Sequence, residues 1–527
     1  MKILVTDDIS PLGLAQLEAL PGASLVVRTG LSEPELMEEI RDADALLVRS
    51  QTQVTERVIE AAQRLRVIGR AGVGVDNIDL AAATRKGVVV VNAPDGNTIA
   101  AAEHTFAMLI ASARYIPQAD ASIRRGKWDR KSFVGVELRG KTIAVLGMGR
   151  IGTEVAKRAM AFGMRVLGYD PFLTEERARE LGVIRKSLEE AIAEADFITV
   201  HTPLTKETRH MLNRDAFARM KEGVRIVNCA RGGIIDEEAL CEALASGKVA
   251  AAALDVFEQE PIPADHPLLS FPNVVVTPHL GASTHEAQVN VAIDVAAEVV
   301  RVLRGEPFRN AVNMPSLTKE QKEVLEPYLL LGEQLGLFIA QLVDGSIADL
   351  EITYGGQLAN YDVAFVTRTV LKGLLGYRHG DEVNYVNAPY LAEQSGLSVR
   401  ETKQPRSKVY TNLLALRVRS EDGEHRIAGT LFNGFGPRII EIDGYSVDAP
   451  PQGKILFTRH VDKPGMIGKI GTWLGNADIN IAGMQVGRKE TGGEAVMLLS
   501  VDRKVPEDVL AQIRQMEGIR FVRAIDL

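Results

Sequence analysis

Three polar residues in the middle of the chain each follow an apolar, strand-like run. Arg231 follows the run in "RIVNCARGGIID", Glu260 lies beyond the run in "AALDVFEQEP", and His279 closes "NVVVTPH". A histidine can exchange a proton near neutral pH, and a neighbouring carboxylate can fix its tautomer. An arginine can bind a substrate carboxylate through two hydrogen bonds. These residue types suit hydride transfer at a 2-hydroxy acid, where the alcohol loses a proton as its hydride leaves.

A glycine-rich turn precedes these residues. The stretch "KTIAVLGMGRIG" places Gly147, Gly149 and Gly152 after an apolar run and at the start of a helical stretch, and the next apolar run ends on Asp170. In a dinucleotide-binding turn the first glycine permits the tight turn, the second lets the backbone approach a pyrophosphate, and the third allows close helix–strand packing. Asp170 would bind the adenosine ribose and disfavour a 2′-phosphate, which predicts NAD rather than NADP.

Each catalytic candidate taken alone is more often an ordinary polar residue on a loop. Their joint occurrence downstream of a dinucleotide-binding turn favours one active site. The alternative for the turn itself is a glycine loop without a ligand. The alternative for His279 is a core histidine whose nitrogens are satisfied by the backbone.

The elements around these residues predict parallel sheets. Residues 1–96 alternate runs such as "KILVTD" and "ALLVRS" with helical stretches, and residues 141–279 repeat the alternation. Such alternation is typical of a doubly wound parallel sheet, whose ligands bind at the carboxyl ends of the strands. Residues 97–125 are predicted to be helical, with a break or kink at Pro117.

The character of the chain changes after Pro315. Residues 317–452 mix helical and strand-like stretches, and residues 453–527 follow the order βαββαβ of a ferredoxin-like domain. We therefore predict an α/β protein with two Rossmann-like domains, an α+β intervening domain and a ferredoxin-like domain. The expected boundaries are 1–96 with 286–316, 97–285, 317–452 and 453–527.

Composition excludes several classes of protein. The formal net charge of −8 argues against binding to nucleic acid. The two cysteines, Cys229 and Cys241, have neither metal-ligand spacing nor a disulfide framework, so no metal is expected and a reduced compartment is favoured. The acidic start of the chain argues against a signal peptide, and no apolar run approaches the ~20 residues of a membrane span. We expect a cytoplasmic protein without a membrane partner.

Several motifs resemble those of the D-isomer-specific 2-hydroxyacid dehydrogenase family. These are "GRAGVGVDNID", "GKTIAVLGMGRIG", "NCARGGIIDE" and "LDVFEQEP". The family's Arg, Glu and His match Arg231, Glu260 and His279. The resemblance covers essentially the whole chain: "VNYVNAPYLAEQSG" is similar to the intervening domain of the family's long form, and the stretch from Phe457 to Arg488 is similar to an ACT regulatory domain.

The resemblance extends the predicted NAD site beyond the glycines and Asp170. With them, the expected cofactor-binding residues are Gly147, Gly149, Arg150, Ile151, Gly152, Asp170, Thr202, Cys229, Ala230, Arg231, Asp255, His279, Gly281 and Ala282.

The long form implies 3-phosphoglycerate as the substrate, at the start of serine biosynthesis. The expected substrate-binding residues are Arg49, Ser50, Val73, Gly74, Asn97 and Arg231, with Arg49 on the phosphate. Arg130 and Lys131 either reach the cleft of a partner subunit or are ordinary surface charges.

The ACT resemblance implies an amino-acid effector, serine, bound between paired copies in a homodimer or homotetramer. His460, Asp462 and Asn480 are the expected effector-binding residues. A dimerisation module without a ligand is the alternative. For the whole chain, the alternatives are another D-2-hydroxyacid dehydrogenase, acting on glycerate or lactate, a NAD-sensing scaffold without catalysis, and an allosteric binding module built on an inactive dehydrogenase.

Overall fold

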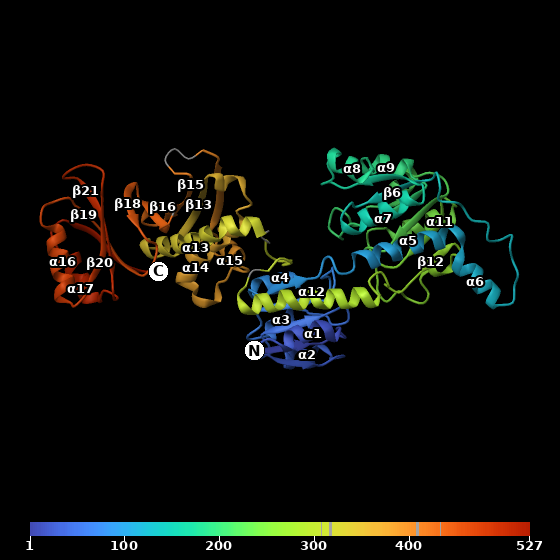
Figure 1. Cartoon of the computed structure of the whole chain (residues 1–527), viewed down its shortest axis with the longest axis horizontal. Helices are drawn as coiled ribbons and strands as arrows, with labels where there is room; N and C mark the ends of the chain where they lie inside the picture. Colours follow the sequence, from blue (N-terminus) through green and yellow to red (C-terminus); the bar gives the residue numbers. More distant parts are fainter. Residues whose placement is uncertain (307, 316–318, 407–409, 433) are drawn as a thin grey trace.

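The computed structural model describes the chain except residues 307, 316–318, 407–409 and 433, and the side chains of residues 319, 320 and 381. Four sheets organise an elongated molecule (Figure 1). The second sheet lies at one end and the C-terminal sheet at the other, with the first and third sheets between them. No helix among the described residues is both long and apolar enough to span a bilayer.

The first sheet is five-stranded and parallel, as the sequence predicts. Its order is β2 (Ser24–Val27), β1 (Lys2–Val5), β3 (Ala45–Val48), β4 (Val67–Arg70) and β5 (Val89–Asn92). Its strands are Val/Ile/Leu-rich because helices cover both faces. The helices between them are α1 (Pro11–Glu18), α2 (Glu33–Glu39), α3 (Glu56–Ala61) and α4 (Leu80–Arg85). The later helix α12 (His285–Arg304) packs against α1, β4 and β5, so the chain returns to this sheet.

The second sheet is seven-stranded and parallel, which confirms the second doubly wound domain. Its order is β12 (Val274–Val276), β11 (Val249–Leu254), β10 (Val224–Asn228), β9 (Phe197–Val200), β6 (Thr142–Leu146), β7 (Arg165–Tyr169) and β8 (Ile184–Arg185). Its helices are α5 (Thr98–Arg114), α6 (Ile116–Arg124), α7 (Arg150–Ala161), α8 (Glu175–Leu181), α9 (Leu188–Glu194), α10 (Arg214–Arg219), α11 (Glu237–Ala245) and the 3₁₀ turn η1 (Pro267–Ser270).

The predicted break near Pro117 is confirmed. It falls at Tyr115, which has a left-handed φ of 52° between α5 and α6. Pro117 lies in the first turn of α6, where its missing N–H leaves no helical hydrogen bond unmade.

The third sheet is mixed and belongs to the intervening region. Its order is β14 (Ser398–Gln404), β13 (Ile347–Gly356), β15 (Asn412–Ser420), β16 (Gly423–Phe432), β17 (Gly436–Ile442) and β18 (Tyr445–Ala449), with β13 and β14 parallel. The helical elements are α13 (Lys319–Leu342), η2 (Gln357–Asn360), α14 (Ala364–His379), η3 (Gly380–Glu382) and α15 (Ala388–Gln394). Sequence reasoning missed α14 and the polar edge strand β14.

The C-terminal sheet is antiparallel, and its elements follow the predicted order βαββαβ. The strands are ordered β20 (Ile481–Arg488), β21 (Glu494–Val501), β19 (Lys454–Val461) and β22 (Ile519–Asp526), with α16 (Met466–Asn476) and α17 (Glu507–Arg514). Both helices begin slightly later than predicted, because Gly465 and Pro506 occupy the N-cap positions.

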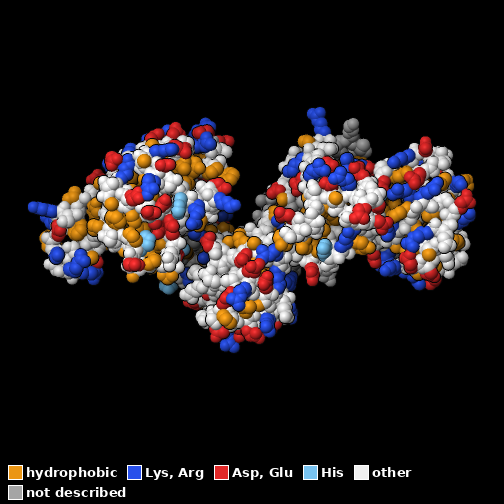
Figure 2. Space-filling model, turned by 180° about the vertical axis from the view of Figure 1, so that it is seen from behind, with side chains coloured by type: hydrophobic (Ala, Val, Ile, Leu, Met, Phe, Trp, Pro, Cys, Tyr) orange, Lys and Arg blue, Asp and Glu red, His pale blue; other side chains and the backbone are white. Residues whose placement is uncertain are grey.

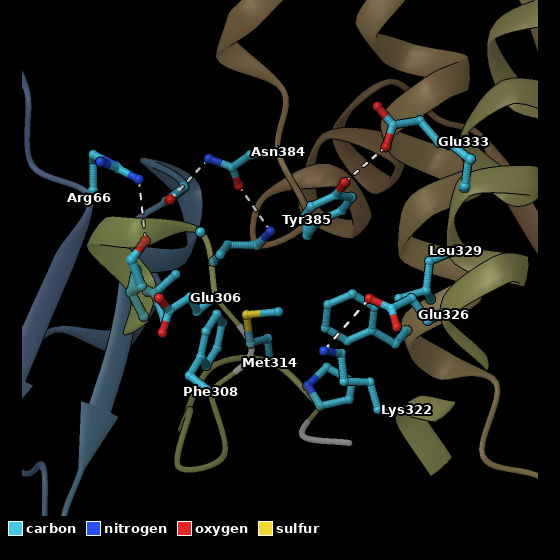
Figure 3. Close-up of a pocket in the computed structure, with 18 of the residues that line it drawn as sticks. Arg66, Glu306, Phe308, Met314, Lys322, Glu326, Leu329, Glu333, Asn384 and Tyr385 are labelled. Carbon is cyan, nitrogen blue, oxygen red and sulfur yellow. Dashed lines mark hydrogen bonds and ion pairs between the residues drawn. The ribbon is translucent and has the colours of Figure 1, made fainter. Parts of the chain in front are cut away.

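The first and third sheets meet at a junction that contains a cavity of about 610 Å³ (Figure 3). Asn384 Nδ2 donates a hydrogen bond of 3.0 Å to the Gly87 carbonyl oxygen across the junction. Val386, from the intervening region, is buried in the hydrophobic core of the first sheet. These contacts connect the intervening region to the first sheet. On the face that Figure 2 shows, acidic and basic side chains alternate over the surface.

Candidate active site

His279 and Glu260 form the centre of the site. The strand β12 ends at Val276, and His279 follows with a left-handed φ of 55°, a conformation that non-glycine residues rarely adopt. Its Nδ1 lies 2.8 Å from Glu260 Oε2, and both side chains are partly exposed. Burial would raise the pKa of Glu260, but its hydrogen bonds with His279 and the Phe257 amide hold the pKa below the ordinary value. Glu260 is therefore a carboxylate at neutral pH.

Asp255 holds the loop that carries His279. Its fully buried carboxylate accepts hydrogen bonds from Thr277 Oγ1 at 2.6 Å and from the amides of Leu280 and Gly281 at 2.7 and 2.8 Å. Its backbone oxygen accepts from the His279 amide at 2.9 Å. Asp255 was predicted as a cofactor-binding residue, which stays a prediction; the structure shows that it anchors the loop around the histidine.

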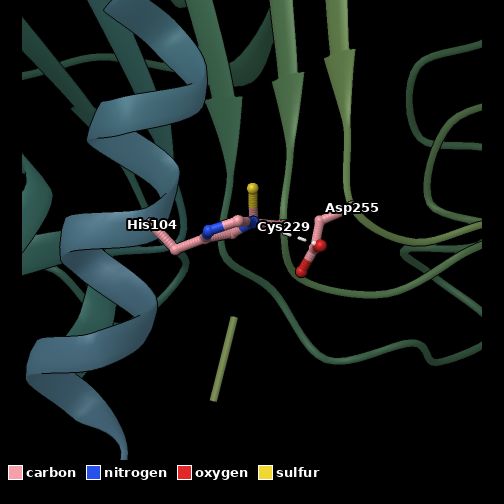
Figure 4. Close-up of side chains that lie close together, drawn as sticks. All are labelled: His104, Cys229 and Asp255. Atoms are coloured by element: carbon pink, nitrogen blue, oxygen red, sulfur yellow. Dashed lines mark ion pairs between the residues drawn. The ribbon is translucent and has the colours of Figure 1, made fainter. Parts of the chain in front are cut away.

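Beside this anchor, three side chains each hold an atom of a kind that can bind a metal ion, and the three atoms lie within 4.8 Å of one another (Figure 4). The residues are His104, Cys229 and Asp255. His104 Nε2 lies 3.1 Å from Asp255 Oδ1. Burial raises the pKa of the Cys229 thiol to about 12, so the sulfur is protonated at neutral pH. A cysteine binds a metal ion as its thiolate, whereas the Cys229 sulfur is protonated and the Asp255 oxygens already accept several hydrogen bonds. The cluster therefore favours a role in supporting the loop over a role in binding a metal.

Arg231 reaches across to the first sheet. It follows β10, and its Nε lies 2.9 Å from Asp76 Oδ2, in the loop between β4 and α4. Its Nη1 donates to the Ala230 carbonyl oxygen at 2.7 Å. A methyl group on Gly74 would lie 1.8 Å from Arg231 Nη2, so the loop of Val73 and Gly74 directly faces the guanidinium. The predicted carboxylate-binding residues from the two sheets therefore meet at one cleft.

Further cations lie on the first sheet's side of the cleft. Arg49 follows β3, and its backbone N–H donates to Asp7 Oδ2 at 2.6 Å. Arg70 ends β4, and its buried Nε has no hydrogen-bond partner among the described atoms. Burial, and then repulsion by Arg231, lowers the pKa of Arg70 to about 10, with Arg49 adding to the effect. Sequence reasoning missed Arg70, although its position at a strand end is the signal that identified Arg49.

The glycine turn has the geometry of a phosphate-binding loop. Gly147 has a φ of 99°, and a Cβ on it would lie 2.7 Å from the His201 backbone. A Cβ on Gly152 would lie 1.9 Å from the Gly147 oxygen, whereas one on Gly149 would meet no described atom within 4 Å. Two glycines thus permit close packing, and Gly149 leaves space at the N-terminus of α7 for a ligand.

Asp170 faces the same turn. Its Oδ2 accepts from the Met148 amide at 2.9 Å and its Oδ1 from the Phe172 amide at 2.8 Å. Each carboxylate oxygen retains a lone pair for a ribose hydroxyl. Arg150 Nε, by contrast, is paired with Asp95 at 2.5 Å.

The predicted cofactor residues follow successive strands of the second sheet. Gly147 follows β6, Asp170 follows β7, Thr202 follows β9, Cys229 follows β10, Asp255 follows β11 and His279 follows β12. Ile151 belongs to α7, and Ala230 and Ala282 lie in the loops after β10 and β12. These positions share one edge because the strands are parallel. The buried oxygens Thr202 Oγ1 and Asn97 Oδ1 have no partner among the described atoms, which suits a polar ligand in this cleft. Ser50 is exposed beside Arg49.

His460 and Asp462 interact electrostatically, but no hydrogen bond or ion pair joins the three predicted effector residues to one another in the described part of the chain. His460 is only 2% exposed and lies 3.3 Å from Thr458 Oγ1. Asp462 Oδ2 is 3.2 Å from Arg488 Nη1, and Asn480 Nδ2 donates to Asp502 at 3.0 Å. An effector would therefore compete with Arg488 for Asp462.

Family models match three parts of the chain. They describe the NAD binding domain of D-isomer specific 2-hydroxyacid dehydrogenases over residues 106–281, the D-3-phosphoglycerate dehydrogenase intervening domain over 324–443, and an ACT domain over 454–518. The matched NAD-binding region contains the glycine turn and the triad of Arg231, Glu260 and His279.

Similar proteins extend the comparison to the full length. D-3-phosphoglycerate dehydrogenase of Methanocaldococcus jannaschii is 49% identical, with 100% of each chain covered. That of Bacillus subtilis is 46% identical, over 100% of this chain and 99% of the relative. Among solved structures, D-lactate dehydrogenase from Aquifex aeolicus in complex with NAD and lactic acid is 31% identical with a TM-score of 0.53, over 60% of this chain and 100% of that chain. Together, the active-site geometry, the order of domains and the full-length similarity establish that the chain belongs to the D-3-phosphoglycerate dehydrogenase family, within the D-isomer specific 2-hydroxyacid dehydrogenases.

Proposed function

We propose that this chain oxidises 3-phospho-D-glycerate to 3-phosphooxypyruvate with NAD, as the first step of the phosphorylated route to L-serine. The observation that carries the proposal is the contact of Arg231 with Asp76, which brings the strand ends of the second sheet, one of them followed by the His279–Glu260 pair, to the arginines at the strand ends of the first sheet. The histidine can accept a proton, and the arginines can bind the carboxylate and phosphate of one small dianionic or trianionic substrate.

The geometry supports a specific division of roles. With its Nδ1–H donated to Glu260, His279 keeps a lone pair on Nε2 that accepts the proton of the substrate hydroxyl. The Glu260 carboxylate then stabilises the imidazolium. Arg231 binds the substrate carboxylate together with the amides around Gly74. NAD, when bound along the glycine turn, supplies the acceptor for the hydride of the substrate carbon.

The test is an assay of the full-length protein with NAD and a panel of hydroxyacids: 3-phosphoglycerate, glycerate and lactate. We expect NADH formation with 3-phosphoglycerate at a kcat/KM well above that for the two unphosphorylated acids. A preference for glycerate or lactate would support another D-2-hydroxyacid dehydrogenase. Binding of NADH without turnover of any acid would support a non-catalytic role.

We further propose that serine is the effector and acts at paired ACT domains in a homodimer or homotetramer. Support comes from the ACT match and from the open face of α16, where Cβ atoms on Gly468 and Gly471 would meet no described atom within 4 Å. A paired copy would cover this face. Sedimentation of the full chain with and without serine tests the oligomeric state. Initial rates measured with added serine test whether serine inhibits. A cytoplasmic location also remains a prediction.

A further inference from the structure

One acidic side chain crosses the catalytic cleft without a role in the reaction described above. Asp76 lies on the first sheet's side, in the loop that also carries Gly74, and its Oδ2 is 2.9 Å from Nε of Arg231 on the second sheet's side. The two residues are 155 positions apart in the sequence. Their ion pair therefore connects the two domains at the point where the substrate carboxylate is expected.

Among the described residues, two of the three guanidinium nitrogens of Arg231 have hydrogen-bond partners, and the third packs against a glycine. Nε points to Asp76, and Nη1 donates to the Ala230 carbonyl oxygen at 2.7 Å. Nη2 lies against Gly74, whose missing side chain leaves room for it. With Nε and Nη1 fixed, Nη2 faces the loop amides that are expected to hold the substrate carboxylate.

The charges around Arg231 make this fixation necessary. Arg70 and Arg49 lie close enough to influence one another electrostatically, and Arg231 repels Arg70. Asp76 and, more weakly, Asp7 attract Arg70, and the Asp7 carboxylate also accepts hydrogen bonds from Thr52 Oγ1 and the Arg49 amide. Asp76 is the acidic group that directly contacts Arg231, so without it repulsion would favour rotation of Arg231 out of the cleft.

We propose that Asp76 is a positioning residue: it orients Arg231 to bind the substrate carboxylate and makes that orientation depend on the apposition of the two domains. The inference rests on the proposed function. Asp76 takes Nε, whereas Nη2, which packs beside Gly74, has no acidic partner among the described residues and keeps its N–H donors for the substrate carboxylate.

The test uses full-length Asp76→Ala and Asp76→Asn. We expect kcat/KM for 3-phosphoglycerate to fall roughly two- to fivefold, mainly through KM, the size expected for an ion pair whose acidic side chain is 70% exposed. The Kd of NADH and the melting temperature should stay unchanged. Glu38→Gln is the matched control, because Glu38 is also an exposed acid of the first domain with an arginine partner, Arg41 at 3.6 Å. A lower KM would show that Asp76 blocks the site. A weaker affinity for NADH or a lower melting temperature would show a structural role. Either result overturns the proposal.

A double-mutant cycle separates a role through Arg231 from an independent one. Alanine offers Asp76 neither a charge nor a donor, so Asp76→Ala should have little further effect in an Arg231→Ala background. Fully additive effects would overturn the proposal. Calorimetric binding of 3-phosphoglycerate to the NADH complex gives a readout that needs no turnover. Weaker binding by Asp76→Ala than by the wild type supports the inference, whether or not the wild type turns the substrate over. An absence of turnover would contradict only the proposed function. No binding by the wild type overturns both.

Discussion

The catalytic cleft and the ACT domain both contain charged residues of the predicted types, but they differ in how those residues are arranged. In the cleft, His279 and Glu260 are paired at 2.8 Å, and Arg231 from the same chain reaches the opposite domain. In the ACT domain, His460 is buried and Asp462 is paired with Arg488. The first region is organised within one chain, and the second has no comparable convergence among its described residues.

The glycines of the two regions show the same difference. A Cβ on Gly152 or Gly232 would lie 1.9 or 1.8 Å from a backbone oxygen, so these glycines permit close packing around the cleft. Cβ atoms on Gly468, Gly471 and Gly475 of α16 would meet no described atom within 4 Å. The comparison teaches that a single chain can preorganise the chemistry, whereas the open face of α16 leaves room for the second ACT domain that we propose.

The largest effect is expected from breaking the organised region. His279→Ala should lower kcat by roughly 10²–10⁴-fold, because it removes the general base. The Kd of NADH should change little, since the histidine transfers a proton and does not hold the cofactor's phosphates. Initial rates and fluorescence titration of NADH measure the two quantities. Near-normal turnover would contradict the role of His279.

A smaller effect is expected at the cation cluster. Arg49→Ala should lower kcat/KM for 3-phosphoglycerate by roughly 10–100-fold and that for glycerate much less, because a charge-assisted contact to phosphate is missing in glycerate. Arg57→Ala is the control, since Arg57 is exposed and paired with Glu33 at 3.2 Å. Equal losses on both acids would show that Arg49 binds a group other than the phosphate.

The cofactor preference should change by about tenfold. Asp170→Ala removes the expected ribose acceptor and the charge that disfavours a 2′-phosphate, so kcat/KM with NAD should fall and the ratio of NADP to NAD use should rise by about tenfold. The Met148 and Phe172 amides also lose their acceptor, so the melting temperature is measured in parallel. An unchanged ratio in a stable variant would argue against Asp170 as the ribose ligand.

The smallest effect on basal turnover is expected in the ACT domain. Asp462→Ala should leave kcat/KM near the wild-type value and weaken inhibition by serine, because it removes the proposed partner of the effector's ammonium group. Arg503→Ala is a control, since Arg503 is exposed and paired with Asp478 at 3.2 Å in the same domain. If the variant retains full serine sensitivity, Asp462 has no part in effector binding.

The sequence by itself determined the fold class and much of the chemistry. Strand-like runs alternating with helices predicted both parallel sheets, because a parallel strand buried on both faces must be apolar throughout. The spacing from Gly147 to Asp170 predicted the NAD turn, because binding of a pyrophosphate by a glycine turn depends on local backbone geometry. The polar edge strand β14 was missed because Val399 is its single apolar residue, so no alternating pattern marks it.

The tertiary structure alone decided which distant residues meet. Arg70 follows the same strand-end pattern as Arg49, and Asp76 lies in the motif "GRAGVGVDNID", but their proximity to Arg231 follows only from the apposition of the two sheets. In the same way, the buried position of His460 and the pairing of Asp462 with Arg488 depend on neighbouring strands and loops. Local sequence specifies backbone conformation and the pattern of burial, whereas contacts across a cleft arise only when separately folded elements are brought together.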